Sequence, residues 1–124
     1  MHRAFDDLFM TTESIHFDAI LDMLGGDRQV VAALLTKFSA ELGSDVAASE
    51  HVLAERDSNA LRQIAHRIKG TSANLQAMML SAAARELEQA CVEASETVWP
   101  VKQRVMAEQA QRVRDDIEAW IAAL

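Results

Sequence analysis

The chain has 124 residues with a single proline, four glycines, no tyrosine and a formal net charge of −7. This length suits one compact domain, and so few turn-forming residues among many alanines, leucines and glutamates favour an all-α fold over a β protein. The negative charge argues against a nucleic-acid binder, which needs a basic face. The sequence also holds no apolar run of membrane-spanning length and no signal peptide. With Cys91 as the only cysteine, a reducing, cytoplasmic location is the simplest expectation.

The first half of the chain predicts a leader and two helices. Residues 1–14 have little periodicity and are expected to form a leader or one short helix. Apolar residues then recur at helical spacing over residues 17–24, and Gly25 and Gly26 end that pattern. A longer pattern covers residues 30–53.

The second half predicts three further helices. Asp57 is suited to cap a helix over residues 58–75. Residues 80–91 form the next apolar pattern, and Pro100 fits the first turn of a last helix that reaches Leu124. Four long helices with short connections predict an antiparallel four-helix bundle, with the short helix near residue 20 packed on it. We expect one domain, over residues 15–124.

His66 is the candidate functional residue. With about 100° between successive residues, it lies about 150° from the centre of the apolar stripe of its helix and should face solvent. Lys69 and Gly70 share this outward face, and residues 56–75 carry a local net charge of +3. A neutral imidazole nitrogen is a nucleophile near neutral pH, and Lys69 could reach a phosphoryl group on it.

Most exposed helical histidines are ordinary polar surface residues, so spacing alone does not decide the role of His66. Gly70 adds weight, because a glycine inside a helix costs about 0.5–1 kcal/mol relative to alanine. Close approach of another molecule to His66 would explain it.

The segment AHRIKGTSANL, residues 65–75, strongly resembles the signature of histidine phosphotransfer (HPt) domains: a histidine, a lysine three residues later, a glycine, small residues and an apolar position. The resemblance extends over about residues 15–124. It includes the Gly-Gly-Asp turn that ends at Asp27 and the sequence around Glu88.

This resemblance implies a four-helix bundle that carries phosphate between receiver domains. By position, His66 would be the phosphoacceptor, Lys69 would stabilise the phosphoryl group, Gly70 would give access and Glu88 would hold the imidazole. Phosphate would come from the aspartyl phosphate of one receiver domain, such as that of a hybrid sensor kinase. It would leave to the aspartate of another, in a response regulator.

The family further implies a covalent phosphohistidine carrier that catalyses little without its partner. It would have no cofactor or metal of its own, with magnesium on the receiver domain. A monomer is expected, because transfer needs an uncovered face. Met1 and the short leader favour a free-standing protein over a terminal module of a hybrid kinase.

One position departs from the family pattern. The family usually has a second glycine ten residues after the histidine, where this chain has Gln76. Two alternative functions therefore stay open: a non-catalytic helical module that binds receivers, and the phosphoacceptor domain of a chemotaxis-type histidine kinase. The Gly-Gly-Asp turn favours a phosphorelay module over the phosphoacceptor domain of a chemotaxis-type kinase.

Four other residues are weaker candidates for a functional role. A second active histidine at His51 is disfavoured, because no lysine–glycine pair follows it. Cys91 falls in the apolar stripe of its helix and is expected to be a buried thiol. Met78 and Met79 are expected at the core or its rim or, if exposed, in a docking patch around His66. The paired inward Glu-x-x-His motifs of a metal-binding bundle are absent.

Overall fold

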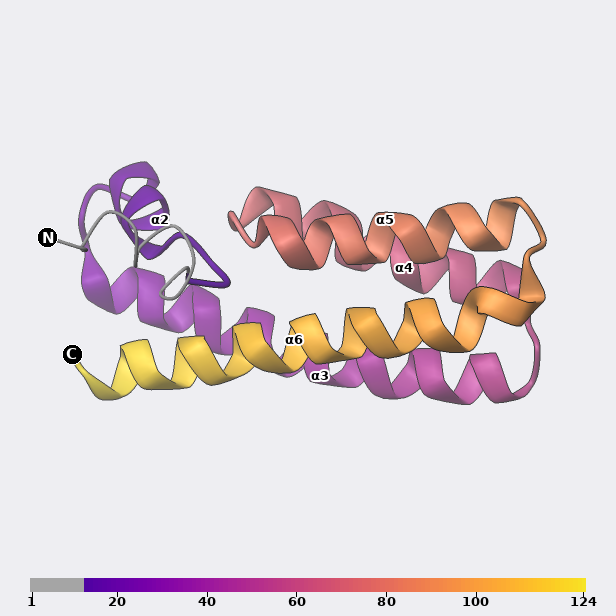
Figure 1. Ribbon diagram of the computed structural model, residues 1–124. Coiled ribbons are helices and arrows are strands. Elements are labelled where there is room, and N and C mark those ends of the chain that lie inside the picture. Colours follow the sequence, from indigo (N-terminus) through magenta and orange to yellow (C-terminus); the bar gives the residue numbers. More distant parts are fainter. Residues whose placement is uncertain (1–12) are drawn as a thin grey trace, which may run out of the picture.

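The computed structural model describes residues 13–124, and these form helices without any strand (Figure 1). The predicted leader, residues 1–14, lies almost wholly outside the described part of the chain. No described helix is long and apolar enough to cross a membrane. The helices, in chain order, are α2 (Phe17–Met23), α3 (Arg28–Ala54), α4 (Ser58–Asn74), α5 (Met78–Val92), the 3₁₀ helix η1 (Glu96–Val98) and α6 (Trp99–Ala122).

The four long helices form an antiparallel bundle, as predicted. Each packs on its neighbours in the cyclic order α3, α4, α5, α6, and α4 and α6 face each other across the diagonal. Figure 1 shows α3 and α6 extending past the turn between α4 and α5, and α2 occupying the space beyond that turn. The short helix expected near residue 20 is therefore present and packs on α3.

Side-chain caps explain where α3 and α4 begin. The carboxylate of Asp27 accepts hydrogen bonds from the backbone N–H groups of Gln29 (3.0 Å) and Val30 (3.1 Å). The carboxylate of Asp57 accepts one from Ala60 at 3.1 Å. Each bond satisfies an amide that has no partner inside its helix. The cap expected at Asp57 is thus confirmed.

Helices α2, α3, α4 and α5 each end in a turn with a left-handed residue just past the C-cap. At the end of α4 this residue is Gln76, with φ +62°. Its N–H donates to the carbonyl of Ala73 (3.1 Å), and the N–H of Ala77 donates to the carbonyl of Ser72 (2.8 Å), which is a Schellman motif. The turn therefore keeps the backbone geometry that glycine favours although Gln76 occupies it, at a cost of about 1–2 kcal/mol.

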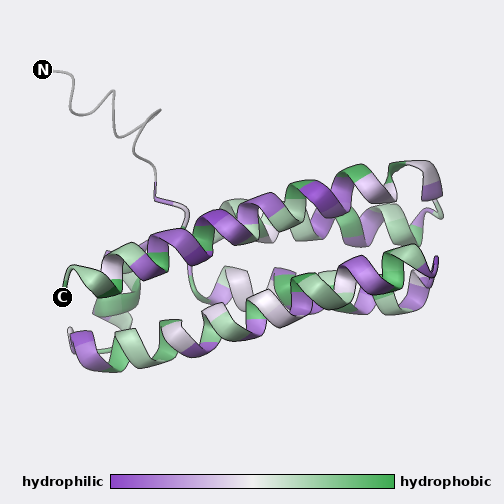
Figure 2. Cartoon of the chain, turned by 90° about the horizontal axis from the view of Figure 1, so that it is seen from below, coloured by the Kyte–Doolittle hydropathy of each residue, from purple (hydrophilic) through white to green (hydrophobic). Residues whose placement is uncertain are grey.

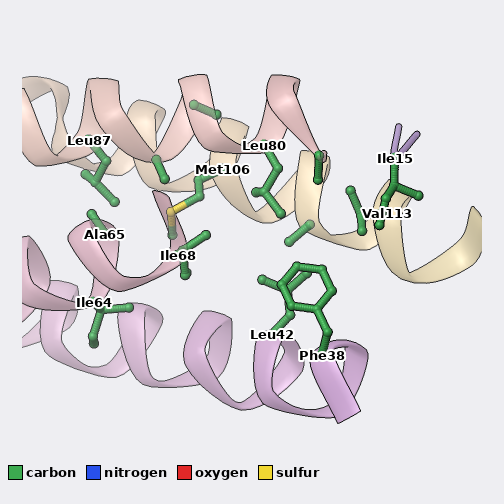
Figure 3. Close-up of a cluster of buried hydrophobic side chains, with 14 of the residues drawn as sticks. Ile15, Phe38, Leu42, Ile64, Ala65, Ile68, Leu80, Leu87, Met106 and Val113 are labelled. Carbon is green, nitrogen blue, oxygen red and sulfur yellow. The ribbon is translucent and has the colours of Figure 1, made fainter. Parts of the chain in front are cut away.

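The core lies along the bundle axis, where all four long helices contribute large apolar side chains (Figure 3). Each long helix mixes hydrophobic and hydrophilic residues along its length, and its hydrophobic residues gather on the inner side (Figure 2). Burying one such leucine or isoleucine contributes about 1.5–3 kcal/mol relative to leaving it exposed. The α4 stripe is fully or nearly fully buried at Leu61, Ile64, Ala65, Ile68 and Ser72.

The segment before α2 anchors the open end of the bundle. Ser14 donates from its backbone N–H (3.0 Å) and its hydroxyl (2.6 Å) to the carboxylate of Asp116 on α6. The ring of Phe17 stacks on Trp120, with the ring centroids 5.2 Å apart. These contacts close the end of the bundle beyond the α4–α5 turn, and no segment of residues 13–124 covers His66 on the outer face of α4.

Candidate functional site

His66 lies in the middle of α4 with its side chain 65% exposed. The two residues on either side of it along the inner stripe, Ala65 and Ile68, are completely buried. Their burial fixes the rotation of α4 about its axis, so the imidazole has to point outwards. The outward orientation expected from the helical spacing is therefore present.

Glu88 reaches His66 from the neighbouring helix α5. Its Oε2 atom lies 2.7 Å from Nδ1 of His66. An ionised carboxylate can only accept hydrogen bonds, so Nδ1 must carry the proton and donate it. The neutral imidazole then keeps its lone pair on Nε2. The contact thus selects one tautomer and leaves Nε2 as the nucleophilic atom.

Lys69 completes the cluster, one helical turn after His66. Its Nζ atom lies 2.7 Å from Oε1, the second carboxylate oxygen of Glu88. The sequence predicted an exposed lysine, whereas the Lys69 side chain is only 31% exposed. The reason is this ion pair, which draws the side chain against α5. Glu88, 16% exposed, therefore contacts both His66 and Lys69.

The ion pair determines the charge state of Glu88. The hydrogen bond from the Lys69 ammonium group lowers the pKa of the Glu88 carboxyl below its usual value. Burial of the carboxyl acts against this effect, and the hydrogen bond with His66 reinforces it. Glu88 is consequently a carboxylate near neutral pH, as the tautomer assignment of His66 requires.

Gly70 follows Lys69 on the exposed surface of α4. A Cβ atom added to Gly70 would meet no other atom of the described chain within 4 Å. The backbone at Gly70 is ordinary helix and no neighbour needs the space, so the bundle itself gives no reason for a glycine. At Gly70 no side chain projects from the surface of α4, so a partner can approach the helix beside His66 more closely than it could past an alanine.

The α4–α5 surface also contains a hollow that sequence reasoning missed. It has a volume of about 200 Å³ and is lined by Lys69, Met78, Ser81, Ala82 and Arg85. The Ser81 hydroxyl donates to the carbonyl oxygen of Lys69 at 2.9 Å and so joins the two helices beneath the hollow. No single-helix pattern could reveal it, because it depends on how α5 lies against α4.

The other candidate residues lie apart from this cluster. His51 is on α3 and contacts Glu55 of the same helix. Cys91 is buried, as expected. Met78 and Met79 are exposed rather than part of the core. Residues 13–124 contain no group of three or more His, Cys, Asp or Glu side chains that could hold a metal ion.

The family model of the Hpt domain matches residues 33–123, which run from α3 through α6. No curated protein and no solved structure gave a significant match. The matched region covers well over half of the chain, and it contains His66, Lys69 and Glu88. The chain therefore belongs to the Hpt domain family, the histidine phosphotransfer modules of phosphorelays.

Proposed function

We propose that the protein carries a phosphoryl group on Nε2 of His66. It accepts this group from the aspartyl phosphate of one receiver domain and passes it to the aspartate of another. The observation that carries the proposal is the cluster at the α4–α5 surface, where Glu88 contacts both the exposed His66 and Lys69, each at 2.7 Å. An ordinary surface histidine has no need of such a cluster.

The chemistry follows from the tautomer. The Nε2 lone pair attacks the phosphorus atom, the bond between phosphorus and the aspartate oxygen breaks, and its electron pair returns to that carboxylate. The phosphorylated ring keeps its proton on Nδ1 and is positively charged, which the Glu88 carboxylate stabilises. Onward transfer reverses these events: the P–N bond breaks, its electrons return to Nε2, and His66 is again neutral.

Lys69 has a role that changes with phosphorylation. Before transfer its ammonium group is paired with Glu88. A phosphoryl group on Nε2 brings three strong acceptor oxygens close to it, and a lysine ammonium group can follow them on its flexible stem. We infer that Lys69 moves from Glu88 towards the phosphoryl group during transfer.

The outer face of α4 and α5 is the proposed docking surface for receiver domains. Gly70 gives the partner close access to His66, and the exposed side chain of Met78 supplies apolar contact area. On this proposal the module works as a cytoplasmic monomer. The receiver supplies the magnesium ion and most of the electrostatic stabilisation of the transferring phosphoryl group.

The test is label transfer from phosphorylated receiver domains to the full chain. We expect acid-labile label on the unaltered protein and none on the His66→Gln variant, because glutamine has no imidazole nucleophile. The matched control is His51→Gln, which should accept label at the unaltered rate. Label on His66→Gln would contradict the assignment of the site, and no uptake from any receiver domain would contradict the carrier function.

A further inference from the structure

Arg85 is a second cation at the candidate site, on α5. It lines the hollow of about 200 Å³ together with Lys69, and its side chain is exposed. The mechanism proposed above does not use it. Its height along the bundle axis relative to His66 nevertheless follows from the packing of the two helices.

The register of α4 against α5 places Arg85 close to the level of His66. The hydrogen bond from Ser81 to the Lys69 carbonyl sets these two residues opposite each other. Because the helices are antiparallel, four residues further along α5 correspond to four residues back along α4. Arg85 therefore lies at about the height of residue 65 along the bundle axis, one residue from the level of His66, and one turn before Glu88.

The carboxylates around Arg85 are engaged with other cations. Glu88 is paired with Lys69 and accepts a hydrogen bond from the neutral His66, and Glu86 is paired with Lys102 at 2.7 Å. Arg85 forms no ion pair or side-chain hydrogen bond with any residue of 13–124. An arginine on the rim of a hollow with apolar walls, supplied here by Met78 and Ala82, can bind a carboxylate through two parallel hydrogen bonds.

We propose that Arg85 determines the affinity for the receiver domain by binding a carboxylate side chain that lies beside the receiver's phosphorylation site. This carboxylate would occupy the hollow between Arg85 and Lys69. This inference rests on the proposed function. A protein face that holds Mg²⁺ beside an aspartyl phosphate is built from carboxylates, because oxygen anions are the ligands of that ion. The two cations of the hollow are complementary to such a face.

The experiment measures binding and transfer separately, on the full chain. The partner is the receiver domain that transfers label fastest to the unaltered protein, loaded with Mg²⁺ and beryllofluoride for calorimetric titration. Arg85→Glu should raise the Kd about tenfold at low salt, with a smaller effect at high salt, as is typical of charge pairs at an interface rim. In label transfer, the half-saturating receiver concentration should rise by a similar factor.

The matched control is Arg104→Glu, an equal charge change on α6, which lies diagonally opposite α4. It should change the Kd less than about twofold. Arg85→Lys should retain part of the affinity, because it keeps the charge and loses the bidentate geometry. Equal Kd values for Arg85→Glu and Arg104→Glu, with normal label uptake on His66, would overturn the role of Arg85 and leave the proposed function intact. Failure of the unaltered chain to bind or accept label from any receiver would overturn both.

Discussion

Two histidines on the surface of this bundle each contact a glutamate, and the contacts differ in kind. His66 is 65% exposed, and its partner Glu88 comes from another helix, lies 2.7 Å away and is 16% exposed. His51 is 73% exposed, and its partner Glu55 lies four residues later on the same helix, 3.4 Å away and 58% exposed. The exposed fractions of the two histidines alone would not separate them.

The difference lies in what holds the glutamate. Two long, solvated side chains of one helix interact by only about 0.2–0.5 kcal/mol, so the Glu55 contact leaves the ring of His51 free to turn. Glu88 is fixed by the packing of α5 and by its ion pair with Lys69. A histidine becomes a defined nucleophile when a carboxylate that cannot move away selects its tautomer.

The first way to test this comparison is to remove the lysine. Lys69→Ala should slow phosphoryl transfer from the receiver about tenfold to a hundredfold, because the cation that moves onto the transferring group is lost. The matched control is Lys102→Ala, which breaks another lysine–glutamate pair of the same 2.7 Å length on the bundle surface. Transfer rates from quenched time courses provide the measurement. Equal slowing in both variants would show that Lys69 acts only through general surface charge.

The second test concerns the carboxylate. The amide oxygen of a Glu88→Gln variant can still accept from Nδ1, so His66 should still take up label. The charge that stabilises the positively charged phosphoimidazole is lost, so uptake of label should be about threefold to tenfold slower near neutral pH. Glu55→Gln should take up label at the unaltered rate, and equal uptake rates for all three proteins would refute the role of Glu88.

The same carboxylate predicts an effect on folding stability. Lys69 lowers the pKa of Glu88 in the folded chain relative to its ordinary value of 4.5. A lowered folded-state pKa means that the stabilising contribution is complete above the unfolded value and disappears as the pH falls through the folded one. Urea titrations should therefore show a steeper loss of stability below about pH 4.5 in the unaltered protein than in Glu88→Gln.

Local patterns were sufficient to predict most of the fold. Helix spacing and the cap at Asp57 act within a few residues, and they located the four long helices. The sequence could not indicate that Gln76 would adopt φ +62°. That conformation is imposed by the packing of α5 against α4, which outweighs a local cost of about 1–2 kcal/mol.

The candidate site likewise has features that follow from one helix and features that depend on the packing of two helices. The exposure of His66 follows from its position on one helix. Its contact with Glu88 joins residues that are 22 positions apart, and only the family resemblance suggested it, because the register between two helices is set by tertiary packing. The hollow beside Arg85 also depends on this register, so the sequence could not predict it. The domain boundary at residue 15 and the functional roles of His66, Lys69 and Gly70 stay predictions.

The smallest effects are expected from glycine substitutions. Gly70 on α4, the helix of His66, can be compared with Gly43 on α3, the helix of His51. A Cβ at Gly70 meets open space, whereas a Cβ at Gly43 on α3 would lie 2.7 Å from Nη1 of Arg114. Gly70→Ala should raise the free energy of unfolding by about 0.5–1 kcal/mol, because alanine is the better helix former. Transfer should nevertheless slow, since the new methyl group obstructs the receiver.

Gly43→Ala should show the opposite combination. The guanidinium group of Arg114 must move, and its hydrogen bond from Nε to the Ser39 hydroxyl (3.2 Å) is lost. This loss of about 0.5–1.5 kcal/mol offsets the gain in helix propensity, so stability should change little. Transfer should keep its normal rate. Denaturant titrations and transfer assays on both variants measure the two quantities separately. A stabilised Gly70→Ala variant with unaltered transfer would show that this glycine has no role in partner access.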